Sequence, residues 1–286
     1  MALSPFACSN CGHWQFYFAT PPNCPICSDV RNDLPEDGWD FRTPADLAPM
    51  LSHHSREVIP GIREFWSTPR FGLDSHGWLL IEPEGNVAFE AAPFYDQDSL
   101  DTIAELGGIR VLAASHPHGY GALWQLQERF SPDLLIQKED LQWTKAFRVT
   151  QPWDEQHEIR PGLTLHHTGG HYEGHSILHD ATRGAVFVGD ALKLDFDAAG
   201  RLAALSSHKA YHKQIPLSPN EASRYRHVFE AIDFDTVFTP FDYATDVPKA
   251  AVLELLDRIV AGPGSTRPVP VPSLIQEGLP SGTKRI

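Results

Sequence analysis

The chain has 286 residues, of which 42% are hydrophobic, so it can bury a sizeable core and is not wholly disordered. Its 37 acidic residues outnumber its 23 basic ones, and the net charge of −14 argues against a protein that binds nucleic-acid phosphates. No apolar run approaches the ~20 residues of a membrane span, and the first residues lack the features of a secretion signal, so we expect a cytoplasmic protein.

All four cysteines lie near the N-terminus as two Cys-x-x-Cys pairs, Cys8 with Cys11 and Cys24 with Cys27. This spacing is typical of one metal ion bound by four thiolates, and the lack of a secretion signal disfavours two disulfides. We expect zinc in a structural site. The order Cys-x-x-Cys-Gly … Cys-Pro-x-Cys also resembles rubredoxin, so iron is the alternative.

After the cysteines, the sequence Thr43-Pro44-Ala45-Asp46 predicts the start of a helix. Short apolar runs predict strands over residues 62–66, 78–81, 87–90, 109–114, 134–137, 163–166, 176–179, 185–189 and 236–239. Helices are expected over residues 99–106, 122–130, 221–232 and 248–260. Strands come first and alternate with helices only later, which favours an α+β sandwich with two mixed sheets over a doubly wound parallel sheet.

The pattern divides the chain into three parts. We expect a four-cysteine segment over residues 1–45, a main domain over 55–262 and a Pro-rich C-terminal tail over 263–286. The tail has repeated prolines and no periodicity, so we expect it to be flexible or to extend along a neighbouring surface.

Two histidines follow the expected buried strand over residues 109–114, in the sequence Ser115-His116-Pro117-His118. Proline biases the residue before it towards an extended conformation, and residues i and i+2 of an extended segment face the same side. His116 and His118 can therefore bind one metal ion together.

Two further segments offer ligands of the same kind. Gly169 and Gly170 allow a sharp turn that presents His171, and Asp190 follows the expected strand over 185–189. Three imidazoles and a carboxylate form a plausible ligand set for Zn²⁺ or Fe²⁺.

The order and spacing of these residues resemble the metallo-β-lactamase superfamily, over roughly residues 58–260. His116 and His118 match the histidines that open the HxHxDH motif of that superfamily. His171 matches the ligand histidine of its HTxGHxxGH segment, and Asp190 matches the carboxylate that usually bridges two metal ions. The resemblance implies an αββα sandwich, here preceded by a small four-cysteine metal-binding segment.

Three positions depart from this pattern. Tyr120 and Gly121 stand where HxHxDH has Asp and His, and Phe241 stands where the superfamily has a late histidine. The superfamily's residues at these positions would hold the second metal ion. The resemblance therefore implies a site with a single ion.

We expect a mononuclear metal-dependent hydrolase, in which a metal-activated water attacks an ester, thioester, lactone or amide bond. Asp190 would bind the metal and orient the water, and Tyr120 would either donate a hydrogen bond to the oxyanion or fill the space of the lost second site. The expected substrate contacts are His208, Tyr211 and His212.

Two alternatives stay open: an iron-dependent oxidoreductase of the same fold, and a non-catalytic metal-binding member. The expected cofactors are zinc in the four-cysteine site and one catalytic zinc, with iron as the alternative. The expected partner is a small-molecule substrate, with no nucleic acid and no membrane. The sequence is also compatible with a homodimer.

Overall fold

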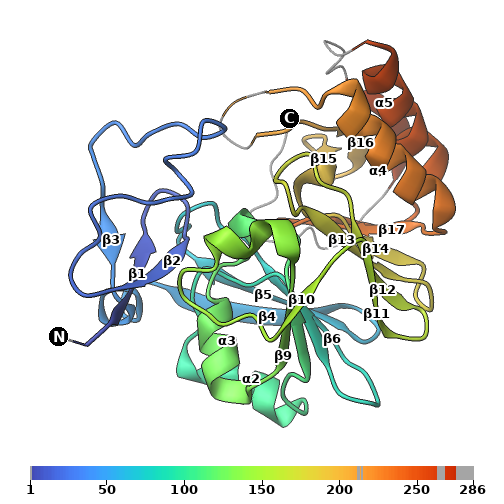
Figure 1. Cartoon of the computed structure of the whole chain (residues 1–286). Coiled ribbons are helices and arrows are strands. Elements are labelled where there is room, and N and C mark those ends of the chain that lie inside the picture. Colours follow the sequence, from blue (N-terminus) through green and yellow to red (C-terminus); the bar gives the residue numbers. More distant parts are fainter. Residues whose placement is uncertain (1, 211–212, 214, 263–267, 275–286) are drawn as a thin grey trace. The chain divides into compact units, whose positions relative to one another are not determined.

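The computed structural model describes residues 2–210, 213, 215–262 and 268–274. The chain divides into two compact units, Met1–Pro152 and Trp153–Ile286 (Figure 1). Each unit contains one large mixed β-sheet and its own hydrophobic cluster.

The first unit begins with a small antiparallel sheet in the order β2-β1-β3, which carries the cysteines. Its strands are β1 (Ser4–Cys8), β2 (Trp14–Tyr17) and β3 (Phe41–Arg42). The short helix α1 (Pro44–Leu47) follows. The Thr43 side chain accepts a hydrogen bond from the Asp46 backbone and Asp46 reciprocates, so the predicted helix start is confirmed.

The large sheet of the first unit has seven strands in the order β10-β9-β8-β7-β6-β5-β4. They are β4 (Ser52–Ile59), β5 (Ile62–Thr68), β6 (Gly77–Leu80), β7 (Val87–Phe89), β8 (Val111–Ala113), β9 (Asp133–Gln137) and β10 (Gln151–Trp153). Strands β4 to β7 form an antiparallel meander, whereas β7, β8 and β9 run parallel. The parallel strands β7 and β8 therefore end at the same edge of the sheet, and the segment after β8 carries His116.

Helices α2 (Gln97–Glu105) and α3 (Leu123–Phe130) contribute Ile103 and Leu126 to the cluster that contains Leu79, Ala88 and Leu112 of the sheet. Helix α2 begins where the Asp96 side chain accepts the Ser99 N–H. Two 3₁₀ turns, η1 (Pro117–Gly119) and η2 (Lys138–Trp143), complete this unit.

The large sheet of the second unit has the order β11-β12-β13-β14-β17-β18. Its strands are β11 (Gln156–Arg160), β12 (Leu163–His167), β13 (Ser176–Asp180), β14 (Ala185–Phe187), β17 (Thr236–Phe238) and β18 (Tyr243–Ala244). Strands β14 and β17 are parallel and their neighbours are antiparallel. A second small sheet, in the order β15-β16-β19, consists of β15 (Lys193–Phe196), β16 (Leu202–Ser206) and β19 (Val269–Leu274).

Helices α4 (Pro219–Ala231) and α5 (Lys249–Ala261) pack together on the second unit (Figure 1). Helix α4 starts with a capping box between Ser218 and Glu221. Its buried face carries Tyr225 and Phe229, which join Val252 and Leu256 of α5 in the core. The 3₁₀ turn η3 (Gly189–Ala191) follows β14 and carries Asp190.

The predicted α+β class with two mixed sheets is confirmed. The structure also has strands that the sequence analysis did not predict, namely β1, β2, β3, β4, β10, β11, β15, β16 and β18. Part of the segment expected to be a tail forms β19. Within the described residues, no helix combines the length and the apolar character that a membrane crossing requires.

Candidate metal centres

The four cysteine sulfurs converge in the small N-terminal sheet. The Sγ atoms of Cys8 and Cys27 are 3.9 Å apart, and those of Cys11 and Cys24 are 3.6 Å apart. All four cysteines are buried and none forms a disulfide. Four sulfurs at about 2.3 Å from a tetrahedral ion are about 3.8 Å apart, so these residues fit a four-thiolate metal site.

Hydrogen bonds within this cluster act on the thiols in opposite directions. Bonds from Cys11, Cys24 and Cys27 hold the pKa of Cys8 well below its ordinary value, whereas the bond with Cys24 raises the pKa of Cys11. The thiols thus compete for negative charge when no cation is present. A metal ion relieves this competition because it favours the thiolate form of every ligand.

His116 and His118 lie side by side after β8, with ring centroids 5.2 Å apart. His116 is extended, as the following proline predicts. His118 differs from the prediction, because it lies in the 3₁₀ turn η1 and not in an extended segment. The tight turn nevertheless brings the two buried imidazoles together.

Ser115 and Glu90 hold the His116 ring. The Ser115 Oγ lies 2.6 Å from His116 Nδ1, and the Ser115 hydroxyl hydrogen-bonds the Glu90 carboxylate. This arrangement fixes the Nδ1 atom and the orientation of the ring, as such hydrogen bonds do for histidines whose other nitrogen binds a metal ion. The sequence analysis missed Ser115 and Glu90, although each directly follows a short buried run of the sequence.

His171 and Asp190 form the second pair of candidate ligands, in the second unit. His171 Nε2 lies 3.3 Å from Asp190 Oδ2, and both residues are buried. Gly169 and Gly170 before His171 have positive φ values of 61° and 90°, so the expected sharp turn is present. A histidine nitrogen and a carboxylate oxygen suit Zn²⁺ or Fe²⁺.

His208 is also buried, with its ring centroid 6.5 Å from that of His171. Next to it, the Ser207 hydroxyl donates to the Ala191 carbonyl at 2.7 Å, which ties this segment to the turn that carries Asp190. The other two expected substrate contacts, Tyr211 and His212, lie outside the described residues.

Tyr120 is buried in the hydrophobic cluster of the first unit, with its ring in edge contact with Phe147 at 5.2 Å. At the next position, a side chain on Gly121 would overlap the Ala91 carbonyl oxygen. The backbone therefore leaves no room for a histidine at position 121.

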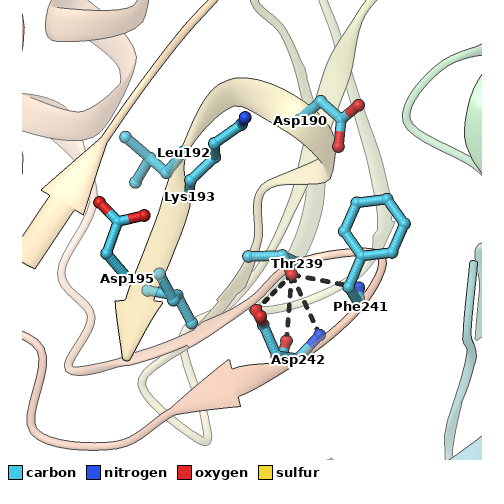
Figure 2. Close-up of a pocket in the computed structure, with 8 residues that line it drawn as sticks. Asp190, Leu192, Lys193, Asp195, Thr239, Phe241 and Asp242 are labelled. Carbon is cyan, nitrogen blue, oxygen red and sulfur yellow. Dashed lines mark hydrogen bonds between the residues drawn. The ribbon is translucent and has the colours of Figure 1, made fainter. Parts of the chain in front are cut away.

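A cavity of about 100 Å³ opens beside Asp190 in the second unit. Figure 2 shows its walls, which combine charged and apolar side chains: Asp190, Leu192, Lys193, Leu194, Asp195, Thr239, Phe241 and Asp242. The Asp242 carboxylate accepts the Thr239 hydroxyl at 2.6 Å, which fixes its position in the wall. Burial raises the pKa of Asp195, another wall residue.

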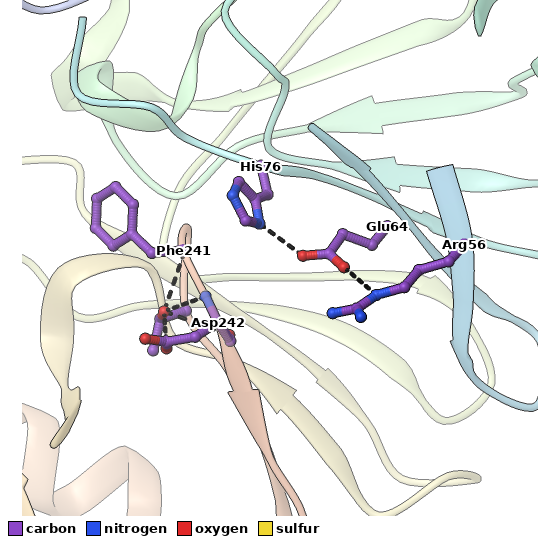
Figure 3. A network of polar contacts seen from close by, with 6 residues as sticks. Arg56, Glu64, His76, Phe241 and Asp242 are labelled. Atoms are coloured by element: carbon purple, nitrogen blue, oxygen red, sulfur yellow. Dashed lines mark hydrogen bonds and ion pairs between the residues drawn. The ribbon is translucent and has the colours of Figure 1, made fainter. Parts of the chain in front are cut away.

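The first unit also contains a buried polar network, shown in Figure 3. Glu64 on β5 accepts hydrogen bonds from Arg56 Nε at 2.8 Å and from His76 Nδ1 at 2.6 Å. His76 and His13 both lie outside the helices and strands, and both are buried.

A family model described as the metallo-beta-lactamase superfamily matches residues 99–234. An uncharacterized protein of Bacillus subtilis (strain 168), YmaE, is 26% identical over 250 residues, which cover 82% of this chain and 88% of that protein.

Solved metallo-β-lactamases have a similar fold. The enzyme from Hirschia baltica is 13% identical, with a TM-score of 0.51 over 73% of this chain and 97% of its own. FIM-1 from Pseudomonas aeruginosa, in its mono-zinc form, is 11% identical, with a TM-score of 0.52 over 73% and 96%. DIM-1 is 12% identical, with a TM-score of 0.54 over 73% and 99%. The chain therefore has the metallo-β-lactamase fold, and its residues 99–234 match the metallo-β-lactamase superfamily in sequence.

Proposed function

We propose that this protein is a metal-dependent hydrolase with one catalytic ion, bound by His116, His118, His171 and Asp190. The first two residues belong to one unit and the last two to the other, and their joint binding of a single ion is part of the proposal. All four are buried, and three imidazoles with one carboxylate are a ligand set of zinc and iron enzymes.

The position of Asp190 is the observation that carries this proposal. Asp190 lies within 3.3 Å of the His171 ring, and it also lines the cavity of about 100 Å³. A candidate ligand thus borders a space in which a small substrate group fits. An ion that serves only to hold the fold does not need such a space beside it.

A bound Zn²⁺ or Fe²⁺ ion would polarise a carbonyl group and lower the pKa of water from about 15.7 towards ~7. The Asp190 carboxylate would accept a hydrogen bond from the attacking water and orient it. Tyr120 remains a candidate donor to the oxyanion, although its contact with Phe147 equally suits a residue that fills space. The reaction class is attack on an ester, thioester, lactone or amide carbonyl.

The proposal of one ion rests on the three departures from the superfamily pattern. Gly121 has no room for a side chain, Tyr120 packs in the core, and Phe241 offers no ligand atom. The four-cysteine site is proposed to bind a second, structural zinc, since four thiolates leave no open position for a substrate.

His118→Ala tests this function. We expect the zinc content to fall from two ions per chain to one and hydrolysis of p-nitrophenyl acetate, a thioester and a lactone to be abolished, because one imidazole ligand is missing. The measurements are metal analysis and initial rates with each probe. The control is His227→Ala, which removes an exposed histidine of α4.

The control should keep both ions and the full rate. Circular dichroism should show the same fold in both variants. A His118→Ala protein that still turned over its substrate at the wild-type rate would rule out the proposed site.

A further inference from the structure

The loop Thr168–His175, which carries His171, is held by a residue of helix α4. The His171 backbone N–H donates a hydrogen bond to the Tyr225 hydroxyl oxygen at 3.2 Å. Tyr225 is completely buried and lies 54 residues further along the chain, outside the motifs that indicated the metal ligands.

The backbone just before His171 rests directly on the Tyr225 ring. A Cβ atom on Gly170 would lie 2.9 Å from the Tyr225 hydroxyl oxygen and 3.1 Å from two ring carbons. Gly170 also has a φ of +90°, which side chains rarely permit. The close approach of the loop backbone to helix α4 therefore requires glycine at position 170, where it meets the Tyr225 ring.

The loop is closed at its base by His175. The Thr168 and Gly169 N–H groups both donate to the His175 carbonyl, at 2.9 and 2.8 Å. The Thr168 Oγ1 lies 2.7 Å from His175 Nδ1, and the Tyr225 hydroxyl lies 3.5 Å from the same nitrogen. One cluster of a hydroxyl, an imidazole and a phenol thus fixes both ends of the turn that presents His171.

A glycine residue loses more conformational freedom than any other residue when the chain around it becomes ordered. A loop with Gly169 and Gly170 would sample many conformations if nothing held it, and each metal-binding event would then cost the free energy of ordering it. Contact with Tyr225 orders the loop before the ion arrives.

We propose that Tyr225 is a positioning residue that fixes the His171 loop and thereby sets the affinity of the histidine site for its metal ion. The proposal rests on His171 being a ligand, as in the proposed function. The proposal gives a role to helix α4, which contributes no metal ligand to the proposed site. The quantity it concerns is the affinity for the metal ion and not the catalytic rate.

Tyr225→Phe in the full-length chain is the test, because it removes one oxygen and keeps the ring packing. Zinc is titrated in competition with a chromophoric chelator, and Co²⁺ is titrated by its visible spectrum. We expect about 10-fold weaker binding at the histidine site, within the range seen when such supporting hydrogen bonds are removed, and unchanged binding at the four-cysteine site. The His171 amide should also exchange its hydrogen faster.

Thr150→Val is the matched control, because the Thr150 hydroxyl also accepts a backbone N–H, that of Leu134 at 2.6 Å, on a strand that carries no candidate ligand. It should lower the melting temperature and leave both metal affinities unchanged. If Tyr225→Phe lowers only the melting temperature, its role is structural and the proposal is overturned.

The same titration separates this inference from the proposed function. If the wild-type chain binds an ion that His118→Ala removes but hydrolyses no probe, the function fails and the role of Tyr225 is still measured. If the wild-type chain binds no ion at the histidines, both are overturned.

Discussion

Glu90 and Gly119 show how closely the surroundings of His116 are packed. Glu90 is one of the few non-glycine residues with a positive φ, 61°, and its carboxylate holds Ser115, the residue before His116. A Cβ atom on Gly119 would overlap that carboxylate. Any side chain between His118 and Tyr120 would therefore force the Glu90 carboxylate to move.

Gly119→Ala should displace the Glu90 carboxylate and disturb both neighbouring histidines. We expect the free energy of unfolding to fall by about 1–3 kcal/mol, as when an extra group is forced into a packed interior, and the histidine site to lose its ion. Denaturant titration and metal analysis check these outcomes. Gly262→Ala is the control, because the added Cβ would meet nothing closer than 4.0 Å. It should change neither the free energy of unfolding nor the metal content.

At the scale of single residues, the sequence indicated the candidate metal ligands but not the residues that hold them in place. The candidate ligands His116, His118, His171 and Asp190 stand in recognisable sequence motifs. Glu90 supports His116 only because β7 and β8 are neighbours in the sheet, and Tyr225 supports His171 only because α4 packs on the loop. Neither adjacency can be read from sequence spacing.

Among the elements, the interior strands of the two large sheets were predictable and their edge strands were not. Strand β8 is completely buried and stands out as an apolar run, Val111–Ala113. Strand β4, at the edge of its sheet, has the sequence SHHSREVI, whose residues are partly or wholly exposed on both faces. An edge strand of this kind lacks the alternation of apolar and polar residues that indicates a half-buried strand.

The hairpin of β12 and β13 should make stability sensitive to acid. Burial, with a smaller contribution from His179, lowers the pKa of His166 on β12 from 6.5 to about 4. Between these values the unfolded chain binds a proton that the folded chain does not, so the free energy of unfolding falls as the pH decreases from 6.5 to 4.

His166→Gln removes this group and should flatten that part of the pH profile. Thermal melts at pH 4 to 7 measure it, with His227→Gln on α4 as the control that keeps the wild-type slope. If the stability of His166→Gln depends on pH in the same way as that of the wild type, His166 is not the group responsible for the acid sensitivity.

For the whole molecule, the number of bound metal ions is the most informative quantity. Cys24→Ser should reduce the zinc content from two ions per chain to one, because three thiolates bind a tetrahedral ion more weakly than four. It should also make residues 1–45 sensitive to limited proteolysis, because a small segment without its ion has little core of its own. Ser28→Ala, which changes an exposed residue beside Cys27, is the control.

The colour of the purified protein adds a simple observation. An iron centre of four thiolates would be red, whereas zinc would leave the protein colourless. A wild-type content of one ion per chain, lost in Cys24→Ser and kept in His118→Ala, would contradict a filled histidine site.

The anchoring of Trp14 has a practical consequence for dissecting this molecule. Its indole donates to the Pro93 carbonyl at 2.8 Å, and its ring meets Trp124 of α3 at 5.2 Å and Phe94 at 6.3 Å. A shortened chain that starts after the cysteine segment would lack Trp14 and expose the rings of Phe94 and Trp124 to water, so it should aggregate. The two metal centres are therefore best separated by point substitutions in the intact polypeptide.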